Sequence, residues 1–90
     1  MTIAVLGAGM VGRAIALDLA NDYQVTSFDL NTFNLEKVKS RNDTIEIVAA
    51  DLSQFTEYKT WFSTFDLVVT AVPGFMGYKT LEAVINVEKN

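Results

Sequence analysis

The sequence contains no cysteine and no histidine, and a single proline among its 90 residues. Without cysteine the chain forms no disulfide and offers no thiolate metal ligand, and without histidine it lacks the commonest metal ligand and the commonest general base. These absences argue against metal-assisted and serine–histidine chemistry. We therefore expect no metal site and assign no catalytic residue in this chain.

Long apolar runs and excess positive charge are also lacking. No apolar stretch approaches the roughly 20 residues that span a membrane, and the first predicted strand begins too close to Met1 for a signal peptide. The net charge of −4 argues against attraction to nucleic acid or to an anionic membrane. We therefore expect a cytoplasmic protein with neither of these partners.

Half of the residues are hydrophobic and 20% are charged, as is typical of one compact domain, here residues 1–90. Short β-branched apolar runs alternate with stretches of helical spacing, which predicts a parallel sheet with right-handed crossovers. The predicted strands are Thr2–Leu6, Gln24–Phe28, Ile45–Ala50 and Asp66–Val72. The predicted helices run from Val11 to near Asn21, from an Asn31 cap through Val38, from a Ser53 cap along Phe55, Tyr58, Phe62 and Phe65, and through Leu81, Val84 and Ile85. The simplest strand order is 3-2-1-4.

Three glycines follow the first strand with the spacing G-x-G-x-x-G, in Gly7-Ala8-Gly9-Met10-Val11-Gly12. The motif begins where a strand ends and finishes in the first turn of a helix, which is the context that dinucleotide binding requires. Gly7 would permit the tight turn, Gly9 the approach of a pyrophosphate and Gly12 the packing of the helix on the sheet. The chain therefore reads as an α/β protein with a Rossmann-type parallel sheet. The alternative is a glycine-rich turn that binds nothing.

Asp29 ends the second predicted strand, 22 positions after Gly7. This spacing is close to that of the carboxylate that accepts hydrogen bonds from the adenosine ribose. A 2′-phosphate there would be repelled, and Leu30 and Asn31 follow with no arginine to receive it, so we expect NAD in preference to NADP. The alternative is that Asp29 is only a cap or turn residue before the second helix.

Two further segments follow predicted strands at the same edge of the sheet. Asp51 could accept a hydrogen bond from the adenine amino group or could equally cap the third helix. The loop Ala71–Phe75 would line the cofactor ribose, although Pro73 and Gly74 are also ordinary turn residues. The aromatic residues of the third helix could stack on bases, but their helical spacing favours core packing.

The stretches AVLGAGMVGRAIALDLA, FDLNTFNLEKVKS, AADLSQF and DLVVTAVPGFMGYKTLEAVI together resemble the N-terminal domain of the saccharopine dehydrogenase-like family. The run from Pro73 to Gly77, followed by Tyr78 and Lys79, is the more particular part of this resemblance. The resemblance implies nicotinamide-dependent chemistry at a carbon–nitrogen bond of an amino acid. It also implies that Met10 and Val11 join the glycines on the pyrophosphate, with Asp51 and Leu52 near adenine. The candidate cofactor-binding residues are Gly7, Ala8, Gly9, Met10, Val11, Gly12, Asp29, Leu30, Asp51, Leu52, Ala71, Val72 and Pro73.

Family members continue with two more strands and a substrate domain, whereas this sequence ends at Asn90. The sheet is therefore expected to be truncated before a fifth strand, and the chain to be the N-terminal part of a longer enzyme. The exposed edge of the fourth strand could also pair two copies in a homodimer. Two other functions stay open: a non-catalytic nucleotide sensor of the potassium-uptake type, and a structural module that has lost its ligand.

Overall fold

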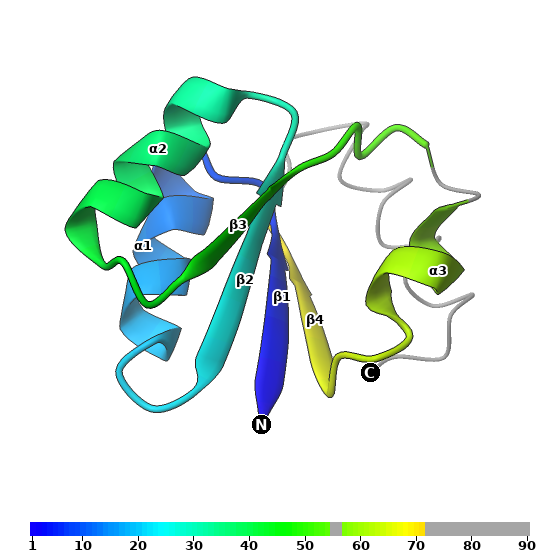
Figure 1. The fold of residues 1–90 in the computed structure, drawn as a ribbon, viewed down its shortest axis with the longest axis horizontal. Coiled ribbons are helices and arrows are strands. Elements are labelled where there is room, and N and C mark those ends of the chain that lie inside the picture. The colour runs from blue at the N-terminus through cyan, green and yellow to red at the C-terminus, as the bar shows by residue number, and fades with distance from the viewer. Residues whose placement is uncertain (55–56, 72–90) are drawn as a thin grey trace.

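The computed structural model describes residues 1–54 and 57–71 and contains a parallel sheet (Figure 1). Its strands are β1 (Thr2–Leu6), β2 (Gln24–Asp29), β3 (Glu46–Ala49) and β4 (Leu67–Thr70), and its helices are α1 (Met10–Leu19), α2 (Thr32–Arg41) and α3 (Tyr58–Phe62). The strand order is β3-β2-β1-β4, so the predicted fold class and the predicted order are confirmed. The expected fourth helix lies outside the described residues.

The sheet is covered on both faces, with α1 and α2 on one side and α3 on the other (Figure 1). Alternate residues of β1 belong to the two hydrophobic clusters on opposite faces of the sheet. Ile3 and Val5 pack with the buried residues Ala16 and Leu35 beneath α1 and α2. Ala4 and Leu6 belong to a second cluster on the α3 side, and all four of these β1 side chains are at most 1% exposed. Burial on both faces explains why the first strand is apolar throughout rather than alternating.

The aromatic residues of α3 form part of the core. Tyr58 and Phe62 are fully buried, and the ring of Phe62 meets the rings of Tyr58 and Phe28 edge to face, each with centroids 4.9 Å apart. This geometry is the favourable one for aromatic pairs. The prediction of core packing is confirmed for Tyr58 and Phe62, while Phe55 lies outside the described residues.

The predicted caps have different outcomes. The side chain of Asn31 caps α2, because its Oδ1 accepts a hydrogen bond from the N–H of Asn34 at 3.1 Å, as predicted. The prediction of a Ser53 cap was wrong, since α3 begins at Tyr58 with Glu57 as its N-cap residue. The hydroxyl and N–H of Ser53 instead donate to the side chain of Asp51, which closes a turn directly after β3.

Candidate functional site

The carboxyl ends of the strands meet at one edge of the sheet, and the loops that follow them extend the ladder. The N–H of Gly7 donates to the carbonyl of Phe28 at 2.7 Å, and the N–H of Ala71 donates to the carbonyl of Leu6 at 2.7 Å. On the other side, the N–H of Ala50 donates to the carbonyl of Asp29 at 3.0 Å. The structure therefore brings the glycine turn, Asp29, the start of the β3–α3 connection and Ala71 to the same edge. In open α/β sheets, ligands bind at this edge.

The three glycines of the turn have different surroundings. Gly7 has a φ of 103°, in the left-handed region that favours glycine. A Cβ on Gly12 would overlap the carbonyl oxygen of Gly7 and stand 2.8 Å from its carbonyl carbon. A Cβ on Gly9, by contrast, would meet no other atom of residues 1–54 and 57–71 within 4 Å, apart from those of its chain neighbours. Two glycines therefore serve the fold, and Gly9 leaves open space at the start of α1.

The N-terminus of α1 has no acceptor from its own side chains. Gly9 is the N-cap residue, there is no side-chain cap hydrogen bond, and the first turn contains no acidic residue. The N–H groups of Met10, Val11 and Gly12 have no acceptor within the helix, and the helix dipole adds a partial positive charge. Met10 and Val11 are 81% and 66% exposed. Together with the open space at Gly9, these groups fit a diphosphate held by backbone alone.

Asp29 stands at the end of β2, beside the glycine turn. One carboxylate oxygen, Oδ2, accepts a hydrogen bond from the N–H of Ala8 at 2.7 Å. The other, Oδ1, accepts from the N–H of Asn31 at 2.9 Å. The carboxylate is therefore bonded to the residue that precedes Gly9, and Leu30, which follows Asp29, is 64% exposed. The sequence did not predict the contact with Ala8, because nothing in the spacing indicates where that N–H points.

Asp51 follows β3 and forms a local turn. Its Oδ1 accepts hydrogen bonds from the hydroxyl of Ser53 and, at 3.0 Å, from the N–H of Ser53. These two donors, the hydroxyl first, lower the pKa of the Asp51 carboxyl from its ordinary value. The alternative that Asp51 caps α3 was wrong, since Glu57 is the N-cap residue. Its predicted contact with adenine stays a prediction.

The remaining predicted site residues have mixed surroundings. The side chain of Leu52 is 4% exposed and packs in the core cluster with Tyr58 and Phe62, and its carbonyl accepts a hydrogen bond from the Tyr58 hydroxyl at 2.6 Å. The Cβ of Ala71 would be 3.3 Å from a Cβ on Gly12, so Ala71 lies against the start of α1. The rest of this predicted segment lies outside the described residues, including Val72, Pro73, the run to Gly77, and Tyr78 and Lys79.

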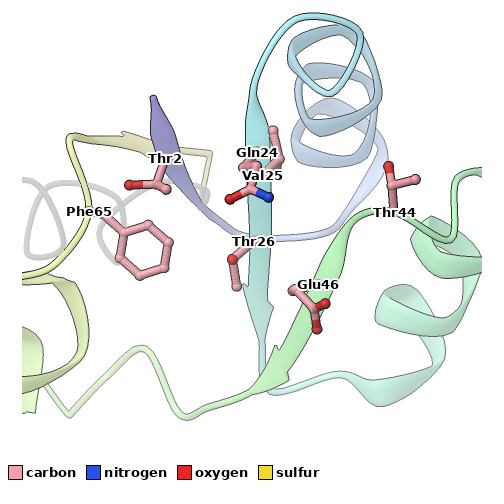
Figure 2. A pocket seen from close by; sticks show the side chains of 7 residues that line it. All are labelled: Thr2, Gln24, Val25, Thr26, Thr44, Glu46 and Phe65. Atoms are coloured by element: carbon pink, nitrogen blue, oxygen red, sulfur yellow. The ribbon is translucent and has the colours of Figure 1, made fainter.

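A cavity of about 240 Å³ opens at the other end of the sheet (Figure 2). Thr2, Gln24, Glu46 and Phe65 line it, and the first three stand at or next to the amino ends of their strands. This cavity is therefore remote from the glycine turn. Among residues 1–54 and 57–71, no group of three or more acidic side chains could hold a metal ion. No helix in the same part of the chain is long and apolar enough to cross a membrane.

The strand order and the glycine turn together define a dinucleotide-binding domain of the Rossmann class. Residues 3–90 match the family described as the saccharopine dehydrogenase NADP binding domain, and the chain belongs to this family. The match supports the resemblance in the sequence and does not favour a potassium-uptake sensor. No curated protein sequence matches the chain.

Solved structures with low sequence identity share the fold. Saccharopine dehydrogenase (L-Glu forming) from Saccharomyces cerevisiae is 17% identical with a TM-score of 0.81, and the match covers 98% of this chain and 20% of that one. A Rossmann-fold NAD(P)-binding family protein from Shigella flexneri is 17% identical with a TM-score of 0.74, over 99% of this chain and 48% of that one. A short-chain dehydrogenase/reductase from Veillonella parvula, solved with NADP, is 14% identical with a TM-score of 0.69, and the match covers 99% of this chain and 44% of that one. The chain thus spans less than half the length of these proteins.

Proposed function

We propose that this chain holds a nicotinamide dinucleotide, with the diphosphate against the N-terminus of α1 and the adenosine ribose on Asp29. The observation that carries the proposal is the pairing of an uncapped helix start, with open space at Gly9, and a carboxylate bonded to the neighbouring Ala8. The N–H groups of Met10 and Val11 are the donors for the diphosphate. This arrangement explains how an acidic chain can bind an anion.

The proposed role is the NAD(P)-binding portion of an oxidoreductase that acts on a carbon–nitrogen bond of an amino acid. When bound, the nicotinamide accepts or donates a hydride, and the residues described here only hold and orient the dinucleotide. The family match and the coverage of only 20% of the saccharopine dehydrogenase chain support a substrate domain elsewhere in a longer protein. Pairing of two copies along β4 and a location in the cytoplasm are further predictions.

We also propose that NAD binds more tightly than NADP. The family description names NADP, whereas the carboxylate of Asp29 supports NAD, because a 2′-phosphate beside it would face like-charge repulsion. The first basic residue after Asp29 is Lys37, and its ammonium lies over the ring of Phe33, 4.5 Å from the centroid. The neighbouring Asn31 side chain is engaged as the α2 cap.

The test compares the rise in melting temperature that each cofactor produces. We expect a larger rise with NAD than with NADP for the native chain, and Asp29→Ala to narrow the difference. The control is Asp22→Ala, at an exposed aspartate before β2, which should leave the difference between the NAD and NADP melting-temperature rises unchanged. Equal rises with both cofactors would contradict the preference, while no rise with either would contradict cofactor binding itself.

A further inference from the structure

The Asp29 carboxylate accepts hydrogen bonds from two backbone N–H groups of the chain. Oδ2 accepts from Ala8 in the glycine turn at 2.7 Å, and Oδ1 accepts from Asn31, the N-cap residue of α2, at 2.9 Å. The first bond joins segments that are 21 positions apart in the chain. One side chain therefore ties the turn after β1 to the start of α2.

These bonds leave the proposed ligand donors untouched. Ala8 is fully buried, and its N–H is directed to Asp29, whereas the N–H groups of Met10 and Val11 belong to the exposed first turn of α1. A carboxylate offers about four lone-pair positions, so each oxygen can also accept a ribose hydroxyl. In the described part of the chain, the N–H of Ala8 is therefore bonded to Asp29, while the N–H groups of Met10 and Val11 lie in the exposed first turn of α1, where an anion could accept from them.

We propose that Asp29 is a positioning residue for the diphosphate site, in addition to its role as a ribose acceptor. By fixing Ala8, it holds the glycine turn in the conformation that presents Met10 and Val11, so that less chain must be ordered on binding. This inference rests on the proposed cofactor function. It differs in predicting that Asp29 aids the binding of a diphosphate that has no ribose.

Electrostatics separates the two roles. If Asp29 were only a ribose acceptor, Asp29→Asn would remove a negative charge next to the anion site, and inorganic pyrophosphate would bind as well as before or more tightly. If Asp29 positions the turn, the variant weakens pyrophosphate binding. An asparagine side chain has one acceptor oxygen and one NH₂ group, so either Ala8 or Asn31 would lose its acceptor.

The experiment titrates inorganic pyrophosphate and NAD into the native chain, Asp29→Asn and the control Asp22→Asn at low ionic strength, with amide shifts from NMR as the readout. The control removes the same charge from an exposed turn at the amino end of β2. We expect Asp29→Asn to weaken pyrophosphate binding about three- to tenfold, the range of one lost hydrogen bond, and Asp22→Asn to leave it within twofold.

Unchanged or tighter pyrophosphate binding by Asp29→Asn, with NAD binding by the native chain intact, would overturn the inference alone. Failure of the native chain to bind either ligand would overturn the proposed function together with it. Hydrogen exchange in the free native chain provides a test that needs no variant. The Ala8 amide should be protected, and exchange at the rate of an unstructured chain would also overturn the inference.

Discussion

Gly12 lies directly against the carbonyl group of Gly7, so closely that a Cβ at position 12 would overlap the carbonyl oxygen. Gly9 lies between them in the sequence, and within the described part of the chain only its own atoms and its chain neighbours lie within 4 Å of the position that its Cβ would take. Two glycines of one motif therefore differ in what they leave room for. Gly12 allows the helix to pack on the turn, and Gly9 leaves space for a ligand.

This difference predicts that an alanine substitution lowers stability at Gly12 and cofactor affinity at Gly9. Gly12→Ala should destabilise the chain by about 2–3 kcal/mol, because the methyl group overlaps backbone that cannot move aside. Gly9→Ala should change the free energy of unfolding by less than about 1 kcal/mol, because its φ of −68° suits alanine. The second variant should nevertheless lose about tenfold in NAD affinity, or ~1.4 kcal/mol.

Urea unfolding and NAD titration of both variants provide the measurements. Each variant serves as the control for the other, since the chemical change is identical. Normal NAD affinity in Gly9→Ala would contradict the proposed location of the diphosphate.

Leu52 and Leu30 form a second matched pair, since both are candidate cofactor-binding residues. Leu52 is 4% exposed and Leu30 is 64% exposed. Leu52→Ala should lower the free energy of unfolding by about 2–3 kcal/mol through the cavity that it leaves, whereas Leu30→Ala should change it by less than about 0.5 kcal/mol. Thermal or urea unfolding checks both values, and equal effects would contradict the different burial of the two side chains.

The hydroxyl of Ser27 offers a stabilising substitution. Ser27 is fully buried in β2, and its Oγ has no hydrogen-bond partner in the described part of the chain. Ser27→Ala should therefore raise the free energy of unfolding by about 1 kcal/mol, because a buried hydroxyl without a partner is costly. Ser40→Ala is the control and should not stabilise, since that exposed hydroxyl donates to the carbonyl of Lys37 at 2.9 Å. A lower free energy of unfolding in Ser27→Ala would contradict the interpretation that the buried Ser27 hydroxyl is costly.

The turn at Asp51 predicts a pH effect. Hydrogen bonds from Ser53 lower the pKa of Asp51 from its ordinary value of 3.8. The turn therefore contributes to stability at pH values above the pKa that Asp51 has in the unfolded chain. This contribution is lost as the pH falls through the lower pKa that Asp51 has in the folded chain. Carbon-13 NMR of the carboxyl should show a lowered midpoint that rises in Ser53→Ala and stays unchanged in Ser40→Ala. A native midpoint at or above the ordinary value would be the opposite result.

Periodicity and turn residues were enough to predict the order of the described strands and helices and the sheet topology. The β-branched run at Thr2–Leu6 and the Asn31 cap both indicate local structure that tertiary packing did not override. The start of α3 was harder to predict, because Ser53 has the chemistry of a helix cap but bonds instead to Asp51. A residue pattern does not show whether a serine will cap a helix or bond to a nearby carboxylate.

The candidate site was predictable in outline only. The strand–turn–helix context of the glycines indicated an anion site, and the geometry around Gly9 and Gly12 is consistent with their separate roles. The bond between Asp29 and Ala8, and the burial of Leu52, could not be predicted. Both depend on the direction of a single N–H or side chain after a strand ends, which is set by tertiary packing.

The most direct test of the account follows the backbone amides during titration of the native chain with NAD. The proposed site predicts that the largest NMR shifts fall on Gly9, Met10, Val11 and Gly12, with smaller shifts at Asp29 and Leu30. Binding that leaves these amides unmoved, or that shifts residues around Glu46 in the cavity at the other end of the sheet, would contradict the account.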